Sequence, residues 1–147
     1  RGELDCSALP GLRVLWLYGN RELTGVVGAG QRLRKLVLGA TACAEVRGFD
    51  LGGLEVLDLA DVGVRDSALR DLLEPCLGHV RRAVLGGNPV GPALLLETAR
   101  RAARLTNLNV ARCPVASVVA LLQALEESRD PAEDLAPSLE VLELSHA

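Results

Sequence analysis

A leucine spacing that returns along the chain constrains its fold more than any other feature of the sequence. Within residues 12–20, LRVLWLYGN, Leu15 and Leu17 lie two residues apart, which is the period of a β-strand, so both side chains point to one face. The side chains that point to the opposite face are Val14, Trp16 and Tyr18. Asn20 closes the unit, where the chain must turn. The stretch therefore predicts a short strand with a leucine face and an aromatic face.

The same spacing occurs six times in one register. Its central apolar position is filled by Leu15, Leu36, Leu57, Ala83, Leu108 and Leu142, at intervals of 21, 21, 26, 25 and 34 residues. Self-similarity at periods of about 20 to 50 residues is typical of stacked repeat proteins. The register predicts short parallel strands at residues 14–17, 35–38, 56–59, 82–85, 107–110 and 141–144.

The segments between the predicted strands are of two kinds. The first two intervals, of 21 residues, leave no room for a full helix, so an extended or 3₁₀ segment is expected there. The three later intervals contain amphipathic stretches, which predict helices beginning near Asp66 or Ser67, beginning near Pro92, and spanning residues 116–127. In the last helix the side chains expected to be buried are Val118, Leu121, Leu122 and Leu125. A charged insertion at residues 126–134 is expected to be an exposed loop.

This register resembles that of the leucine-rich repeat superfamily over nearly the whole chain, and the later repeats resemble its ribonuclease-inhibitor-like and cysteine-containing subtypes. The resemblance implies an α/β fold, a leucine-rich repeat solenoid with a curved parallel sheet on its concave side and helices on the convex side of the later repeats. It also implies that Asn20 and Asn88 belong to an asparagine ladder, in which the side-chain amide satisfies backbone groups at the turns of adjacent repeats. Cys113 replaces the asparagine of its repeat and is expected to be a small buried side chain.

A single domain is expected for residues 1–147, in the form of one array of about six repeats. The sequence contains 2% aromatic residues and no methionine, so its core must be aliphatic. Neither end carries a capping segment with a polar outer face, which repeat arrays need for solubility. We therefore expect a fragment of a longer array or of a larger protein, with trimming of the chain as the alternative.

The sequence lacks the marks of a secreted or membrane protein. It contains no Asn-x-Ser/Thr sequon, no signal peptide and no apolar run of membrane-spanning length. Its four cysteines lie 37, 33 and 37 residues apart, so no pair has the spacing of a zinc knuckle or a redox motif. These patterns favour an intracellular, cytoplasmic protein without a membrane partner.

No constellation of residues indicates catalysis. His79 and His146 have no metal or nucleophile partner at motif spacing. Gly28 and Gly30 begin a Gly-x-Gly, but Leu33 stands where a dinucleotide site needs its third glycine. We expect no enzyme activity, no cofactor, no metal and no small-molecule substrate.

The outward columns of the predicted strands hold the main candidate site. Trp16 and Tyr18 are the only tryptophan and tyrosine of the chain, and both are predicted to face away from the core. An exposed apolar patch with a charged rim is typical of a protein-binding hot spot. The candidate partner-binding residues are Val14, Trp16, Tyr18, Lys35, Val37, Val56 and Asp58. The alternative is that a missing segment of the same polypeptide covers this patch.

A second candidate surface is rich in arginine and comprises Arg81, Arg82, Arg100, Arg101 and Arg104. An arginine cluster fits contact with nucleic acid or an acidic partner. No aromatic residue is interleaved there, and Glu97 is placed to pair with Arg101 at an i, i+4 spacing. A solvated helix face is therefore the favoured interpretation of these arginines.

The sequence thus favours a non-catalytic protein–protein interaction scaffold that binds a protein partner, or part of a larger complex, on its concave face. The alternative is a structural subunit of a large assembly that contacts nucleic acid or an acidic partner through the arginine-rich convex face. An enzyme is disfavoured.

Overall fold

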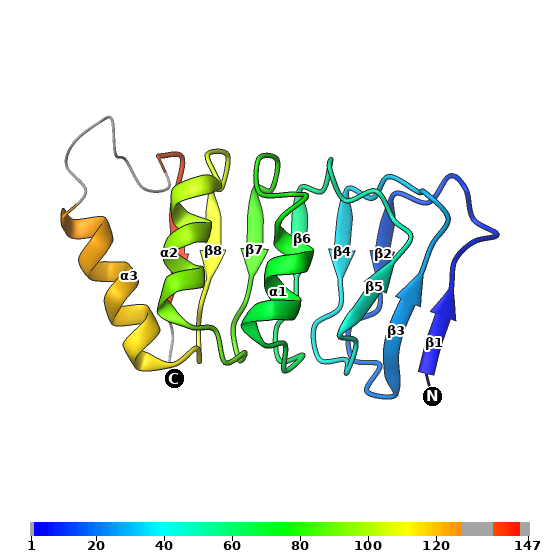
Figure 1. Cartoon of the computed structure of the whole chain (residues 1–147), viewed down its shortest axis with the longest axis horizontal. Coiled ribbons are helices and arrows are strands. Elements are labelled where there is room, and N and C mark those ends of the chain that lie inside the picture. Colours follow the sequence, from blue (N-terminus) through cyan, green and yellow to red (C-terminus); the bar gives the residue numbers. More distant parts are fainter. Residues whose placement is uncertain (1, 128–136, 145–147) are drawn as a thin grey trace.

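The computed structural model describes residues 2–127 and 137–144, which form a mixed α/β structure with two parallel sheets and three helices (Figure 1). Part of the charged insertion expected at residues 126–134 lies outside the described residues, as does His146. Among the residues described, no helix is long and apolar enough to cross a bilayer.

The larger sheet has six strands that pair in parallel in the order of the chain. They are β2 (Val14–Trp16), β4 (Lys35–Val37), β6 (Val56–Asp58), β7 (Arg82–Val84), β8 (Asn107–Asn109) and β9 (Val141–Glu143). Neighbouring strands pair at equivalent positions of the sequence repeat, so that Leu15 lies opposite Leu36, and Leu36 opposite Leu57. The predicted strand positions and their parallel pairing are confirmed, each strand being one residue shorter at its carboxyl end.

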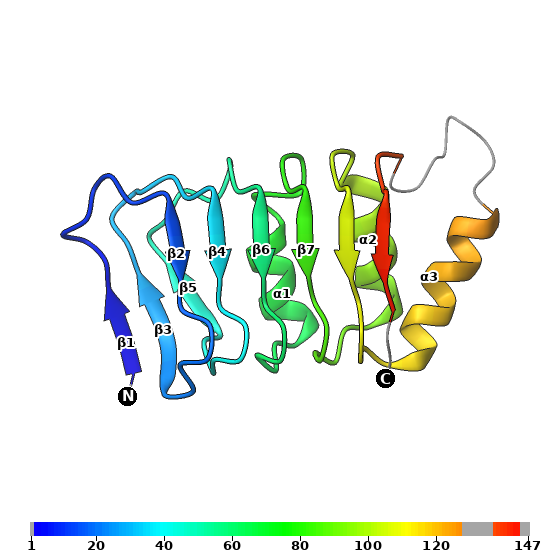
Figure 2. The same ribbon diagram turned by 180° about the vertical axis from the view of Figure 1, so that it is seen from behind.

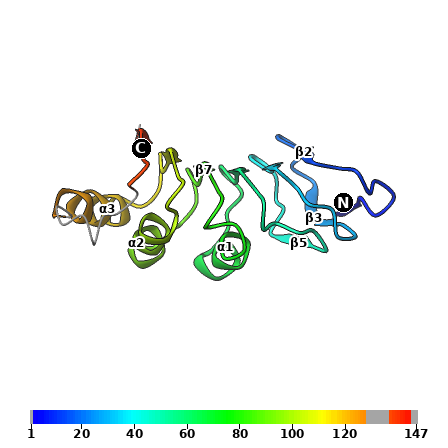
Figure 3. The same ribbon diagram turned by 90° about the horizontal axis from the view of Figure 1, so that it is seen from above.

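A second layer covers one side of this sheet (Figure 3). Its first part is a smaller parallel sheet of β1 (Gly2–Asp5), β3 (Leu23–Val27) and β5 (Glu45–Arg47), formed by the short return segments. Its second part consists of the helices α1 (Asp66–Leu73), α2 (Pro92–Arg101) and α3 (Val115–Glu127), which follow β6, β7 and β8. Extended early returns and three later helices were both predicted, and both are confirmed.

The core lies between the two layers and is aliphatic, as the composition predicts. The largest fully buried side chains are Leu33, Leu36, Leu38, Leu54, Leu57, Leu59, Leu69, Leu73, Leu85, Leu95, Leu105 and Leu108. Full burial of a leucine stabilises the folded state by about 1.5–3 kcal/mol relative to exposure. The leucine spacing therefore provides the main apolar stabilisation of the fold.

The prediction that Leu122 is buried is wrong, because this side chain of α3 is 38% exposed. The helix packs against α2, and the neighbouring Leu121, about 100° around the helix from Leu122, is fully buried. No other helix of the described residues follows α3, so its outer face has no neighbouring helix to cover it.

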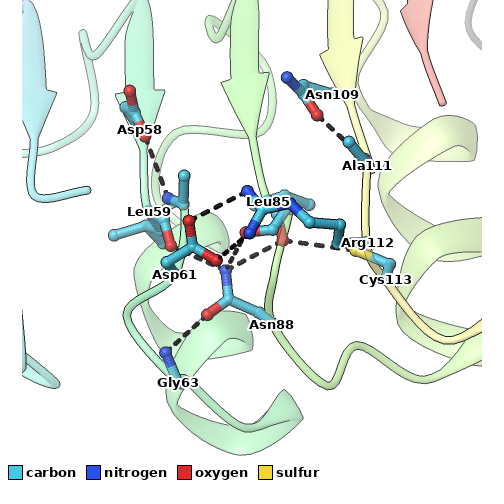
Figure 4. A network of polar contacts seen from close by, with 12 residues as sticks. Asp58, Leu59, Asp61, Gly63, Leu85, Asn88, Asn109, Ala111, Arg112 and Cys113 are labelled. Atoms are coloured by element: carbon cyan, nitrogen blue, oxygen red, sulfur yellow. Dashed lines mark hydrogen bonds and ion pairs between the residues drawn. The ribbon is translucent and has the colours of Figure 1, made fainter. Parts of the chain in front are cut away.

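Polar side chains close several of the turns that follow strands of the larger sheet, and Asn88 is the clearest example (Figure 4). Its buried amide donates hydrogen bonds to the carbonyl oxygens of Leu59 and Leu85, at 2.7 and 2.9 Å. Its side-chain oxygen accepts from the backbone N–H groups of Gly63 and Val64. The ladder role predicted for Asn88 is confirmed, since Leu59, Gly63 and Val64 belong to the preceding repeat.

Other residue types close the remaining turns. Asn20 is exposed and donates only to the Leu17 carbonyl within its own turn, so among the described contacts it does not link adjacent repeats. Thr41 donates to the Leu38 carbonyl from its hydroxyl group, at 2.7 Å. Cys113 is buried, as predicted, and its thiol contacts the Leu85 carbonyl at 3.4 Å.

Candidate interaction surface

Figure 2 shows the face of the six-stranded sheet that the second layer leaves uncovered, here called the open face. Alternate side chains of each strand point to this face. On β2 these are the residues we call the aromatic patch: Val14 and Trp16 of the strand, and Tyr18 just after it. Their exposed fractions are 46%, 67% and 56%. Leu15, between the first two, is 7% exposed. The inward and outward assignment predicted for this strand is confirmed.

The edge position of β2 explains why the aromatic patch is so open. β2 pairs with β4 on one side and ends the sheet on the other. Trp16 therefore has a neighbouring strand on one side only, where Val37 lies opposite it. The indole projects from a backbone that is already hydrogen-bonded to β4, so the direction in which the side chain leaves the strand is set before any partner binds.

The prediction that Val37 belongs to the exposed patch is wrong, because Val37 is only 3% exposed. It lies in register between Trp16 on β2 and Asp58 on β6. Because neighbouring strands lie about 4.8 Å apart, the side chains of Trp16 and Asp58 flank the shorter side chain of Val37 on both sides and shield it from solvent. Val84, between Asp58 and Asn109, is buried at 7% for the same reason.

The remaining members of the predicted site lie on β4 and β6, the next two strands of the sheet after β2. Lys35 is exposed, whereas Val56 and Asp58 are half-buried. One carboxylate oxygen of Asp58 accepts a hydrogen bond from the Ala60 backbone N–H at 3.0 Å, which holds the carboxylate over the end of β6 (Figure 4). Of the two charged residues of the predicted rim, Lys35 is therefore the exposed one and Asp58 the half-buried one.

Gly39 shapes this surface, and sequence reasoning did not single it out. A Cβ atom at this position would lie 2.8 Å from the Tyr18 ring and 3.0 Å from an Asp58 carboxylate oxygen. The absence of a side chain thus lets the Tyr18 ring lie over Gly39 with Asp58 beside it. The signal in the sequence is the run of small residues in the Tyr18 column, which continues with Gly39, Ala60, Gly86 and Ala111.

The arginine-rich surface is only partly as predicted. The guanidinium of Arg101 lies 2.6 Å from the Glu74 carboxylate and 3.0 Å from that of Glu97, so the expected i, i+4 pair forms. The hydrogen bonds that Arg101 donates to the Glu74 and Glu97 carboxylates raise the pKa of Arg101. In return, the hydrogen bond from Arg101 lowers the pKa of Glu74. Arg101 is therefore neutralised locally and contributes little net charge to this surface.

The other four arginines of this surface are exposed, and within the described part of the chain no ion pair involves them. They are Arg81, Arg82, Arg100 and Arg104. Arg82 lies on β7, within the strand predicted at residues 82–85. The prediction that Arg104 shares the outward helix face with Arg100 and Arg101 is wrong, because the backbone leaves the helical conformation at Ala102 and Arg104 follows the end of α2.

A further arginine, Arg112, is engaged in a contact that sequence reasoning missed. Its guanidinium makes two parallel hydrogen bonds to the Asp61 carboxylate, at 2.6 and 3.0 Å (Figure 4). Asp61, Gly87 and Arg112 occupy the same position in three successive repeats, and all three have positive φ, between 56° and 76°. The pair therefore spans the intervening repeat, and it raises the pKa of Arg112.

The described residues contain no group of three or more His, Cys, Asp or Glu side chains that could hold a metal ion. His79 is exposed, as predicted. The four cysteines are free and buried, and burial raises the pKa of Cys43 to about 11 and of Cys76 to about 12. These two thiols are protonated at neutral pH and are poor nucleophiles.

Comparisons of the chain with protein-family models, with curated proteins and with solved structures found no match.

Proposed function

We propose that this chain is a leucine-rich repeat array that acts as a non-catalytic, intracellular scaffold and binds a protein partner on the open face of its six-stranded sheet. The observation that carries the proposal is the aromatic patch. Trp16 and Tyr18, the only residues of their kinds in the chain, are 67% and 56% exposed on the open face, beside Val14 at 46%.

Two physical arguments support a protein as the partner. Aromatic side chains with a polar tip bury a large apolar area and lose little conformational freedom when they are bound, because they have few rotatable bonds. The patch also has a charged neighbour, Lys35, which suits the polar rim of a protein interface. A small-molecule site would instead need an enclosed cavity with convergent polar groups.

The parallel strands paired at equivalent repeat positions support the repeat-array part of the proposal. Each added repeat extends the sheet by one strand and the core by one leucine layer. Such a surface is wide and rigid, and it presents side chains in columns that another protein surface can match.

The test compares the wild-type protein with a Trp16→Ala variant. Partners captured from cell extract by the wild type are identified, purified and titrated against both proteins. Loss of a central aromatic residue should weaken binding by about 2 kcal/mol or more, roughly thirtyfold. Val115→Ala removes an apolar side chain that is 71% exposed on α3, away from the open face, and serves as the matched control.

Circular dichroism and thermal unfolding establish that both variants are folded. Unchanged affinity of a folded Trp16→Ala variant, for every partner that the wild type captures, contradicts the proposal. If Trp16→Ala and Val115→Ala lose the same affinity for the partner, the interface is not centred on the aromatic patch and the proposal is wrong.

The arginine-rich surface supports a second candidate function, a structural subunit that contacts nucleic acid or an acidic partner. The specific observation is that Arg81, Arg82 and Arg104 are exposed without an ion pair among the described residues. The neutralisation of Arg101 reduces the charge available for this role, so the aromatic patch remains the favoured site.

A further inference from the structure

Two exposed cations lie on the open face in the interior of the six-stranded sheet (Figure 2). Lys35 is the first residue of β4 and Arg82 the first residue of β7. Both point outward, because the residues that follow them, Leu36 and Ala83, are fully buried. β4 and β7 each have a paired strand on both sides, so the exposure of these cations does not depend on the ends of the sheet.

No acidic residue separates these two cations. Both lie in register with Val56 of β6, which is half-buried, so the three residues form one row across the strands. The Cα atoms of Lys35 and Arg82 are therefore two strand spacings apart, roughly 10 Å. The preceding position differs, since Arg34 there lies 3.1 Å from the Glu55 carboxylate. Within the described part of the chain, no ion pair involves either cation of the row.

The two acidic side chains on the strands of this sheet are already hydrogen-bonded. The Asp58 carboxylate accepts from the Ala60 backbone N–H at 3.0 Å, and the Glu143 carboxylate accepts from the Asn109 amide at 3.4 Å. These acids are thus directed to groups of the protein itself. The charge that the open face leaves for a partner is mainly positive.

The aromatic patch adjoins the row of cations. Val14 of β2 lies opposite Lys35 of β4, so the row continues into the patch. Three strand spacings separate Val14 from Arg82, about 14 Å, which is the length of four to five residues of extended chain. One short segment laid across the strands can therefore contact the aromatic patch and both cations.

We propose that the partner binds through an acidic segment, in which an apolar residue rests on the aromatic patch and carboxylates pair with Lys35 and Arg82. The inference rests on the proposed function and adds the chemistry of the partner. The apolar contact supplies most of the affinity, because exposed ion pairs contribute little. The two cations supply the selectivity, since they attract an acidic residue and repel a basic one at the same place.

A protein segment fits this face better than the phosphates of a nucleic acid. Asp58 follows Val56 by two residues and points to the same side of β6, so a negative charge lies beside the row. A continuous phosphate chain would pass close to that carboxylate, whereas a protein segment can place a neutral residue there. Binding of a nucleic acid also relies on the neutralisation of several phosphates, and the row provides two cations.

The test begins with a displayed library of random short peptides, selected on the complete natural polypeptide. Peptides that also bind the Trp16→Ala variant are removed, so those retained depend on the aromatic patch. The retained peptides should contain more Asp and Glu, and less Lys and Arg, than the starting library. Retained peptides without this acidic excess would overturn the inference and leave the proposed function standing. If no peptide depends on Trp16, both fail.

The retained peptides are then synthesised and titrated against charge-reversed proteins. Lys35→Glu and Arg82→Glu should each weaken binding by about tenfold, because attraction is replaced by repulsion. The matched control is Arg65→Glu, at an exposed arginine directly before α1 that has no ion pair among the described residues. It changes the net charge equally and should alter the affinity less than about twofold. Circular dichroism establishes that all three variants are folded.

A peptide in which each Asp and Glu is replaced by Lys separates pairing from damage to the fold. It should bind Arg82→Glu more tightly than it binds the wild type. Equal losses of the acidic peptides in Arg82→Glu and Arg65→Glu, or no preference of the lysine peptide, would overturn the inference. Single-stranded RNA of mixed sequence is titrated in parallel. If it binds more tightly than the acidic peptides and depends on Lys35 and Arg82, the partner is a nucleic acid and the inference is wrong.

Discussion

Asn88 uses both ends of its side-chain amide to join two neighbouring turns. Its nitrogen donates to the Leu59 and Leu85 carbonyls, and its oxygen accepts from two backbone N–H groups of the preceding repeat. Asn88 is 1% exposed, and its bonds to Leu59, Leu85 and Val64 are buried. Asn20 has the same sequence position but lies in the first strand's turn, and the described residues place no repeat turn before it. The number of hydrogen bonds that an asparagine makes at this repeat position thus depends on whether another repeat turn lies beside it.

Asn88→Ala should therefore lower the free energy of unfolding on the order of 3 kcal/mol, because it leaves buried carbonyl and N–H groups without partners. Asn20→Ala is the matched control and should cost less than about 1 kcal/mol, since it removes one exposed hydrogen bond. Urea denaturation of the two variants measures the difference. Similar losses in both would contradict the contribution assigned to the buried amide.

The open-face residues show how far sequence reasoning reaches at this scale. Alternation along β2 places Trp16 and Tyr18 outward because a strand has a period of two. It does not predict the burial of Val37, which depends on the size of the side chains on both neighbouring strands. The Asp61–Arg112 pair was missed because it joins residues 51 positions apart.

At the level of elements, β2, β4, β6, β7 and β8 are each followed by a turn in which one residue takes a left-handed conformation. The residues in this position are Gly19, Ala40, Asp61, Gly87 and Arg112, with φ between 56° and 87°. Their backbone N–H groups donate along the sheet, for example from Asp61 to Gly86 and from Gly87 to Ala111. The pairing of successive turns thus requires a positive φ at this position. A non-glycine residue adopts that conformation at a cost of about 1–2 kcal/mol.

Gly87→Ala tests this position where it is most crowded. A Cβ atom there would overlap the Asp61 carboxylate, which crosses Gly87 to reach Arg112, and it would also be strained at φ +76°. The variant should lose about 1–3 kcal/mol of stability in urea denaturation. Gly11→Ala, where no atom lies within 4 Å, should stay within about 0.5 kcal/mol.

A second variant separates the two contributions to this loss of stability, the overlap with the Asp61 carboxylate and the strain of a positive φ. Combining Gly87→Ala with Asp61→Ala removes the carboxylate that the new methyl group meets. Part of the stability should then return, and the remainder is the cost of the left-handed backbone. No recovery in the double variant would mean that the collision contributes nothing.

The helices α1 and α2 are joined by an ion pair that depends on pH. The hydrogen bond from Arg101 lowers the pKa of Glu74 in the folded protein. A carboxylate with a lowered folded-state pKa stabilises the fold above its unfolded-state pKa, and this contribution is lost as the pH falls through the folded-state pKa. The melting temperature should therefore decrease in acid, below the ordinary pKa range of glutamic acid.

Glu74→Gln is the variant that isolates this contribution. It keeps the shape of the side chain but removes the charge, so its melting temperature should fall less on acidification than that of the wild type. Glu22, an exposed residue outside α1 and α2, gives the control Glu22→Gln. Parallel melting curves of wild type and Glu74→Gln across the acid range would contradict the assignment.

The sequence predicted the order of the six strands of the larger sheet and of the three helices, because one spacing governs it. A period of two within each strand, and intervals of 21 to 34 residues between equivalent strand positions, define both the inward leucines and the direction of pairing. The exposed outer face of α3 and the open edge of β2 were not predicted. The exposure of each depends on whether another helix or strand packs beside it. The local pattern of apolar residues is the same in either case, so it cannot predict the exposure.

At the scale of the molecule, the two candidate surfaces differ in the force that would hold a partner. The aromatic patch offers apolar area, whose contribution is insensitive to ionic strength. The arginine-rich surface offers exposed charge at Arg81, Arg82 and Arg104. Contacts of these three residues with phosphates would release counterions and would weaken steeply as salt is added.

Affinity measured between about 50 mM and about 200 mM salt therefore separates the two functions. A partner bound through Trp16 and Tyr18 should change affinity less than about threefold, because little charge is neutralised. Three arginine–phosphate contacts would lose roughly fortyfold over the same range. Duplex DNA of mixed sequence, titrated in parallel, provides the reference. If the natural partner follows the steep dependence, and replacing Arg81, Arg82 and Arg104 by serine removes it while Trp16→Ala does not, the arginine-rich surface is the functional one.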